Sequence, residues 1–139
     1  MLCVILLVYR HGVIGLKVFK NAWFGRFARK ERISADALWN AVERAKKGQI
    51  DADLGGGVIK QRIARPGEGK SKGYRSIVLF RKGEKSFFVY GFPKSELGNI
   101  REDEEKQFKK MAKHVLALTD AQLSELVANG QFEEVAKDG

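Results

Sequence analysis

The chain has 139 residues, with 26 basic and 17 acidic side chains and a formal net charge of +9. Its length is that of one domain, and hydrophobic residues, at 44%, are numerous enough for a packed core, which excludes a disordered chain. A single cysteine, Cys3, excludes a disulfide framework and a cysteine-ligated zinc site, and the only two histidines, His11 and His114, disfavour a histidine-ligated metal. These counts favour a protein of the reducing cytoplasm that needs no metal or other cofactor.

The chain begins with an apolar run of nine residues, MLCVILLVY. A membrane-spanning helix needs about 20 apolar residues. A signal peptide needs a basic segment before the run and a small-residue cleavage site after it, and neither is present. Two interpretations stay open: an additional strand, or translation from an upstream start. We expect residues 1–14 to be an N-terminal extension and residues 15–139 to form one domain.

The positive charge is concentrated in the middle of the chain. Residues 60–94 carry ten basic and two acidic side chains, whereas residues 95–139 carry six basic and ten acidic ones. Such a concentration indicates a polyanionic partner, with phosphate first among them. The plain alternative is a solvated basic face that only keeps the protein soluble.

The first part of the chain predicts a strand and a helical hairpin. The strand covers residues 15–19, and the first helix covers residues 21–33. Ser34 is a typical N-cap for the second helix, which ends near Gly48. Apolar residues recur at helical spacing in both helices and are interpreted as core: Trp23, Phe24, Phe27 and Ala28 in the first, and Leu38, Ala41, Val42 and Ala45 in the second.

The period then changes from helical to that of a strand. Residues 55–65 alternate, with Ile59, Gln61 and Ile63 on one face and Lys60, Arg62 and Ala64 on the other. Residues 74–80 and 86–92 are two more β-rich runs. The segment 66–73, PGEGKSKG, is predicted to be a loop that is neither strand nor helix. We expect an antiparallel sheet of three or four strands, apolar on one face and cationic on the other.

The last third returns to helix. Asn99 and Glu102 have the spacing of a capping box, and the apolar stripe that follows consists of Phe108, Met111, Ala112, Val115 and Leu116. A second box, Thr119 and Gln122, opens a shorter helix that carries Leu123, Leu126 and Val127 and stops at Gly130. The order of elements predicts an α+β domain.

Residues 64–71, ARPGEGKS, match a relaxed phosphate-binding loop pattern. In nucleotide-binding domains a parallel strand precedes this loop and a helix begins at its lysine. Here Gly73 and a β-branched run follow instead, so we expect neither nucleotide binding nor hydrolysis.

Cations and aromatic residues are interleaved in the basic segment. This composition suits single-stranded RNA, because cations bind phosphates and aromatic rings stack on bases. If the segment cleaves RNA, lysines would transfer protons, arginines would stabilise the charge on phosphorus, and the ribose 2′-hydroxyl would be the nucleophile. A binding face without catalysis explains the composition equally well. The set consists of Lys60, Arg62, Arg65, Lys70, Lys72, Tyr74, Arg75, Tyr90, Phe92 and Lys94.

Three segments resemble RelE/HigB-type toxins of bacterial type II toxin–antitoxin modules, and the resemblance runs from Leu16 to about Val135. They are FARKERI at 27–33, LGGGVIKQRIARPGEGKSKGYR at 54–75, and FFVYGFPKSELGNI at 87–100. The resemblance implies a RelE-like fold, with the strand and hairpin packed on the sheet and helices at the C-terminus. It also implies a ribosome-dependent mRNA endonuclease that is inhibited by a co-encoded antitoxin.

The resemblance assigns roles residue by residue. Arg62 matches a position in the family's lysine-rich strand, Arg75 the arginine that binds the scissile phosphate, and Lys94 the cation beyond the fourth strand. Lys70 joins these three as catalytic, although it lies in a loop longer than in the best-known members. A tyrosine that some members use near the final helix has no counterpart. The residues assigned to RNA binding are Lys60, Arg65, Lys72, Tyr74 and Phe92, the last as a base-stacking or orienting residue.

The expected partners are messenger RNA, the ribosome and an antitoxin, the last of the helix-turn-helix class, with no membrane and no nucleotide cofactor. A gyrase-inhibiting toxin of the ParE type and an RNA-binding module without catalysis are the alternatives. The basic residues of the helical hairpin are expected to dock on ribosomal RNA: Arg26, Arg29, Lys30, Arg44, Lys46 and Lys47.

Overall fold

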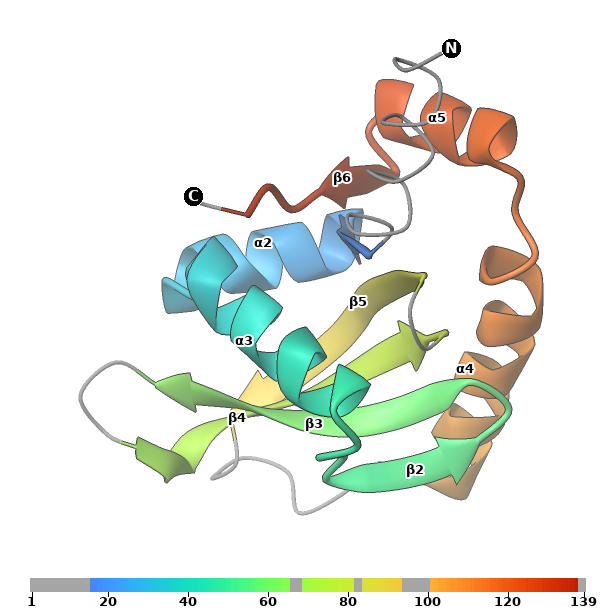
Figure 1. The fold of residues 1–139 in the computed structure, drawn as a ribbon. Helices are drawn as coiled ribbons and strands as arrows, with labels where there is room; N and C mark the ends of the chain where they lie inside the picture. Colours follow the sequence, from blue (N-terminus) through green and yellow to red (C-terminus); the bar gives the residue numbers. More distant parts are fainter. Residues whose placement is uncertain (1–15, 66–68, 82–83, 94–100, 138–139) are drawn as a thin grey trace, which may run out of the picture.

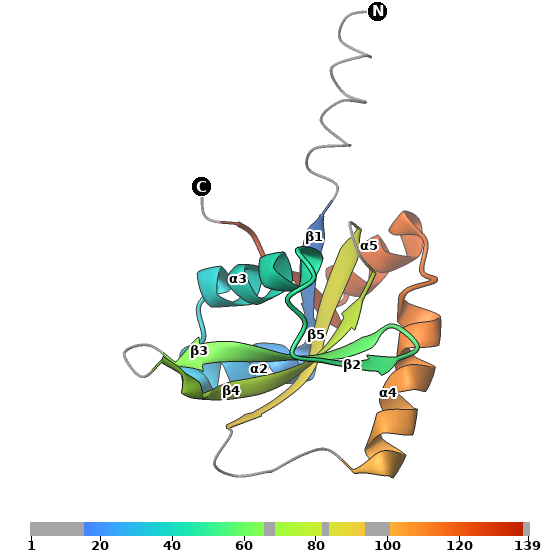
Figure 2. The ribbon, with the colours of Figure 1, turned by 60° about the horizontal axis from the view of Figure 1, so that its bottom comes forward.

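The computed structural model describes residues 16–65, 69–81, 84–93 and 101–137. They form one six-stranded sheet with helices against both of its faces (Figures 1 and 2). The strand order is β2-β3-β4-β5-β1-β6, in which β1 and β5 are parallel and the other neighbours antiparallel. The α+β class is confirmed. In this part of the chain no helix is both long and apolar enough to cross a membrane.

The predicted strand and helical hairpin are confirmed as β1 (Lys17–Asn21), α2 (Ala22–Glu31) and α3 (Ala35–Lys46). The Asn21 side chain accepts a hydrogen bond from the backbone N of Phe24 at 2.8 Å, and the predicted N-cap Ser34 accepts one from Ala37 N at 3.2 Å. Arg32, at φ 57°, ends α2 two residues earlier than predicted. Gly48, at φ 88°, follows α3 as expected for a left-handed glycine after a helix.

The sheet has two strands that the sequence pattern did not indicate, so the expectation of three or four strands was too low. They are β2 (Ala52–Gly55) and β6 (Phe132–Glu134), and both lie at an edge of the sheet. Strands of four and three residues are too short to show a period of two. They form because β3 and β1 offer them hydrogen-bonding partners.

The prediction of a loop over residues 66–73 was wrong for most of its length. The three central strands are β3 (Val58–Arg65), β4 (Gly69–Phe80) and β5 (Lys85–Pro93), and Arg65 pairs with Gly69. Residues 69–73 of the predicted loop therefore belong to β4, and residues 66–68 lie outside the described residues. Glycines and lysines have low strand propensity, but an antiparallel neighbour supplies backbone hydrogen bonds whatever the side chains are.

Helices α4 (Glu102–Val115) and α5 (Asp120–Ala128) follow β5. The box at Thr119 and Gln122 is confirmed, with the side chain of each residue accepting from the backbone N of the other at 3.1 and 2.9 Å. The capping box predicted at Asn99 and Glu102 was placed two residues too early in the sequence. The helix is capped two residues later, where the Glu104 carboxylate accepts from the backbone N of Arg101 at 3.0 Å, and Asn99 lies outside the described residues.

Both faces of the sheet carry a hydrophobic core, so the expectation of one apolar and one wholly cationic face was wrong. Ile59 and Ile63 of β3 pack against α2 and α3. On the opposite face, Val58, Ile77 and Leu79 pack with residues of α4 and α5. The helices α2 and α3 lie next to each other over one side of the sheet (Figure 1), and α4 packs against the other. Along β3 and β4, Lys60, Arg62 and Arg75 lie on the second face, beyond the part that packs against α4.

One buried polar side chain joins α3 and the segment after it to β3. Gln61 is fully buried on the α3 face, where its Nε2 donates to Ala41 O at 2.9 Å and to Gln49 O at 3.1 Å. Its Oε1 accepts from Asp51 N at 3.0 Å. Every hydrogen-bonding group of this amide is used, as burial of a polar group requires.

We expect Gln61→Leu to lower the free energy of unfolding by about 2 kcal/mol or more, because it leaves buried backbone groups without partners. Urea unfolding followed by circular dichroism measures this change. Gln107→Leu, at an exposed position of α4, is the matched control and should change the stability by less than about 0.5 kcal/mol. Equal stabilities of the two variants would show that the Gln61 network contributes nothing.

Candidate nucleic-acid interface

Two arginines lie directly opposite each other on neighbouring strands. Arg62 of β3 pairs with Arg75 of β4, and Arg75 pairs with Phe92 of β5. Directly opposite residues of an antiparallel pair carry their side chains on the same face. The backbone N and O of Arg62 bond to side chains on the outer side of β3. The arginine pair, Arg62 and Arg75, is therefore of the non-hydrogen-bonded kind, in which facing side chains lie closest.

The face that holds the arginine pair changes from core to cationic along the strands. Val58 and Leu79, which pair with each other, belong to the core under α4 and α5. Next along the strands comes Lys60, which pairs with Ile77, and Ile77 pairs in turn with Tyr90. The arginine pair follows in the next position. Alternation along β3 thus places Lys60 and Arg62 on one face, as predicted, and both are partly exposed.

The arginine pair is electrostatically unfavourable in the free protein. Like charges directly opposite in a sheet destabilise the pairing. Among the described residues Arg75 has no ion-pair partner, and Arg62 has one, Asp51, whose Oδ1 lies 3.8 Å from Arg62 Nε. An arrangement that lowers stability and leaves charge unneutralised is typical of a site built to bind an anion.

Of the residues assigned to RNA binding, Tyr74 is not part of this surface. It lies on the α3 face with 2% of its area exposed, and its hydroxyl donates to Glu31 Oε1 at 3.0 Å. Its assignment was wrong because β4 alternates, so neighbours of Arg75 along the chain point to the other face. Phe92 is on the correct face but only 3% exposed, which supports an orienting role rather than base stacking.

For the remaining assigned residues, the structure describes the backbone or nothing at all. Arg65, Lys70 and Lys72 lie at the far end of the β3–β4 hairpin, where the backbone but not the side chains is described. Lys94, which follows β5, lies outside the described residues.

In the helical hairpin, the structure contradicts the interpretation of two residues, Trp23 and Arg44. Trp23, which was interpreted as core, is 39% exposed, with its ring stacked on Phe27 at 5.4 Å between centroids. Arg44 was expected to dock on RNA, but it is engaged inside the protein: its Nη2 donates to Arg62 O and its Nη1 lies 3.8 Å from Asp51 Oδ2. The other five cations of the predicted docking surface are exposed, and Arg29 also pairs with Glu133.

The sequence pattern gave no signal for Asp51, the acidic residue beside Arg62. Its position depends on where β2 begins, and β2 was not predicted. The structure therefore adds one residue to the surroundings of the arginine pair.

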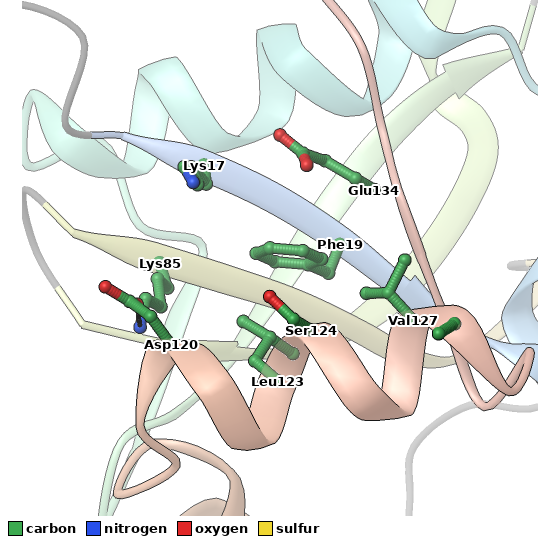
Figure 3. A pocket seen from close by; sticks show the side chains of 9 residues that line it. Lys17, Phe19, Lys85, Asp120, Leu123, Ser124, Val127 and Glu134 are labelled. Atoms are coloured by element: carbon green, nitrogen blue, oxygen red, sulfur yellow. Dashed lines mark hydrogen bonds and ion pairs between the residues drawn. The ribbon is translucent and has the colours of Figure 1, made fainter.

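A cavity of about 330 Å³ lies elsewhere in the molecule, between α5 and the strands β1, β5 and β6 (Figure 3). Lys85 and Asp120 form an ion pair of 2.7 Å at its rim. Lys85 begins β5, whereas Phe92 is near its end. The cavity contains none of the assigned site residues and is separate from the cationic surface.

The arginine pair can hold a phosphate. Each guanidinium is a permanently charged fork of N–H donors that fits the oxygens of a phosphate group, and the two forks approach from adjacent strands. Across the part of the chain that is described, no group of three histidine, cysteine, aspartate or glutamate side chains could hold a metal ion. The charge that the described surface offers to a phosphate is that of its arginine and lysine side chains.

Comparison with known proteins identifies the family. The family model described as the RelE toxin of the RelE/RelB toxin–antitoxin system matches residues 16–135. No curated protein matches the chain. The family match spans every described helix and strand, including β2 and β6. The chain belongs to the RelE family and is the toxin of a toxin–antitoxin system, whose partner is a cognate antitoxin.

Proposed function

We propose that this toxin is a ribosome-dependent mRNA endoribonuclease, an mRNA interferase that stops translation. The observation that carries the proposal is the pairing of Arg62 with Arg75 across adjacent strands, on a partly exposed face with a single acidic neighbour among the described residues. Two clustered guanidinium groups match the charge that develops on a phosphate during cleavage. The RelE family, whose toxins are known endoribonucleases, supports the same activity.

The proposed reaction is a transesterification within the message. The 2′-oxygen of a ribose attacks the adjacent phosphorus, the bond from phosphorus to the 5′-oxygen of the next nucleotide breaks, and a 2′,3′-cyclic phosphate and a 5′-hydroxyl result. One proton leaves the 2′-hydroxyl and one is delivered to the 5′-oxygen. Arg62 and Arg75 stabilise the extra negative charge of the pentacoordinate phosphorus, as cationic clamps do in phosphoryl transfer. Lysines of residues 60–94 are proposed to move the protons, with Lys70 and Lys94 completing the site.

The other parts of the surface have supporting roles in this proposal. Lys60, Arg65 and Lys72 bind neighbouring phosphates, and Phe92 holds the strand end in place. The exposed cations of α2 and of the end of α3 dock on ribosomal RNA. The antitoxin is proposed to be a helix-turn-helix protein that covers or distorts the basic face. A gyrase-inhibiting toxin would have no use for a phosphate clamp, so the arginine pair favours the nuclease.

We expect Arg75→Ala to abolish growth arrest in cells that express the toxin without its antitoxin. A contact to the charge of the transition state contributes several kcal/mol, so cleavage should fall by at least about 10²-fold. The variant should remain folded and be at least as stable as the wild type, because the substitution removes the repulsion between opposed arginines. Colony counts after induction and thermal unfolding of the purified protein measure the two effects.

The matched control is Arg81→Ala, which removes an exposed arginine just after the same strand, where it pairs with Glu84 at 3.7 Å. Its toxicity should equal that of the wild type. Full toxicity of a folded Arg75→Ala protein would remove Arg75 from the mechanism. Equal losses in both variants would show that total positive charge matters rather than this position.

We also expect cleavage to continue in excess chelator and to require the ribosome. Arginines can supply the charge stabilisation that a metal provides in other nucleases, but they do not align a 2′-hydroxyl for in-line attack on flexible RNA. The ribosome, by bending the bound message, would supply that alignment. The 3′ ends made from a model message are mapped with and without ribosomes, each with and without chelator.

Ribosome integrity in chelator is controlled separately, by sedimentation and by cleavage with an unrelated metal-independent ribonuclease. Loss of cleavage in chelator on intact ribosomes would contradict the metal-independent reaction. Efficient cleavage of naked RNA would contradict the ribosome requirement and leave the nuclease assignment in place.

A further inference from the structure

Strand β3 loses its outer neighbour before it reaches the arginine pair. The pairing between β2 and β3 includes Ala52 opposite Lys60 and extends no further toward Arg62. The backbone N–H and C=O of Arg62 point to this outer side. Two side chains take the place of the missing strand: Asp51 Oδ2 accepts from Arg62 N at 2.7 Å, and Arg44 Nη2 donates to Arg62 O at 2.5 Å.

Asp51 also contacts the Arg62 side chain. Its Oδ1 lies 3.8 Å from Arg62 Nε, close enough for an ion pair but too long for a hydrogen bond. Arg62 Nε itself is buried and has no hydrogen-bond partner, whereas 43% of the Arg62 side chain is exposed. The carboxylate thus attracts the inner part of the guanidinium and leaves much of the side chain open to a ligand.

Asp51 is itself held firmly. Its backbone N donates to the fully buried Gln61 side chain at 3.0 Å, and its Oδ2 lies 3.8 Å from Arg44 Nη1. The Asp51 and Arg44 side chains are 26% and 14% exposed, so solvent screens their interaction less than it would on an open surface. Asp51 is thus held both at its backbone and at its carboxylate, so it can in turn hold Arg62 in one position.

We propose that Asp51 is a positioning residue that acts through Arg62, with Arg44 holding the backbone carbonyl of that same residue. This inference depends on the proposed nuclease function. Asp51 holds the backbone of Arg62 and favours one rotamer of its side chain. The guanidinium is therefore already in position when the scissile phosphate binds. Misplacement of a positioned group by about 1 Å can lower a rate by on the order of 10²-fold.

The expected signature is a lower rate without weaker binding. Asp51→Ala removes the acceptor and the charge, and should lower the single-turnover cleavage rate at saturating toxin by on the order of 10²-fold. Asp51→Asn keeps an acceptor for Arg62 N but loses the charge, and should lower the rate by about tenfold. The concentration of toxin that half-saturates the ribosome should stay the same or fall in both, because removing an acid makes the protein more cationic.

The matched control is Asp53→Ala, which removes another acid two residues away, in β2, whose carboxylate accepts from Gly55 N at 2.9 Å. It raises the net charge by the same amount but does not touch Arg62, and its cleavage rate should equal that of the wild type. Thermal unfolding of every variant checks that each is folded.

A double-mutant cycle tests whether Asp51 acts through Arg62. In an Arg62→Ala background, Asp51→Ala should change the residual cleavage rate by less than about twofold. An equal fractional loss in both backgrounds, or weaker ribosome binding together with the lower rate, would show a general structural role and overturn the proposal.

The failures of the two proposals can be told apart. If wild-type toxin does not cleave ribosome-bound message, the nuclease function fails, and this inference fails with it. If the wild type cleaves and folded Asp51→Ala and Asp51→Asn cleave at its rate, the positioning role alone is wrong. If Asp51→Ala does not fold, Asp51→Asn decides: a reduced rate with unchanged binding supports the proposal, and a wild-type rate overturns it.

Discussion

The register of the β3–β4 pair is the constraint on which the rest of the molecule depends. With Gln61 opposite Ser76 on the α3 face, Arg62 must lie opposite Arg75 on the other. A slip of β3 by one residue would turn Arg62 toward the α3 core and expose Ile59 and Ile63. The buried Gln61 network opposes such a slip, because the hydrogen bonds from this amide to α3 and to the segment after it form in one register only.

The same register explains how a small domain can keep two cores and a cationic surface. The strands of the sheet are long enough that α4 and α5 cover one part of their second face and leave another part open. Each face thus contributes apolar burial, which offsets the unfavourable pairing of two arginines. Packing stabilises most of the sheet, whereas the opposed Arg62 and Arg75 destabilise it at one position. The proposed chemistry occurs at that position.

Sequence patterns predicted the features that depend on local periodicity. The helical hairpin, the Ser34 cap and the alternation of β3 all follow from residues close together in the chain, and the structure confirms them. Three failures have one cause, which is that the deciding partner lies elsewhere in the fold. Strand β6 forms because β1 is beside it, Gly69 is in a strand because Arg65 pairs with it, and Trp23 is exposed although its spacing is that of a core residue.

The candidate site was also predicted only in part, and again the features that follow from local alternation were the ones predicted. Composition and alternation placed Lys60, Arg62 and Arg75 on a cationic surface, and the family resemblance supplied their roles. Tyr74 was misassigned because an interleaved aromatic on an alternating strand points away from its cationic neighbour. Asp51 was missed because it contacts Arg62 from the position just before β2 begins, and β2 was not predicted.

Among the residues that the structure describes, one acid, Asp51, forms an ion pair with the two opposed arginines, at Arg62. Both the absence of this acid and the addition of a second one would make the arginine pair less suited to the scissile phosphate. Without Asp51, the guanidinium of Arg62 would be repelled by Arg75 and free to turn away from it. With a second acid on Arg75, a phosphate would have to displace two ion pairs before it gained any contact. At 3.8 Å from Arg62 Nε, the Asp51 carboxylate attracts the guanidinium without forming the bidentate pair that would occupy its donors. The surface therefore keeps its attraction for a polyanion and still presents one of its two charges in a fixed position.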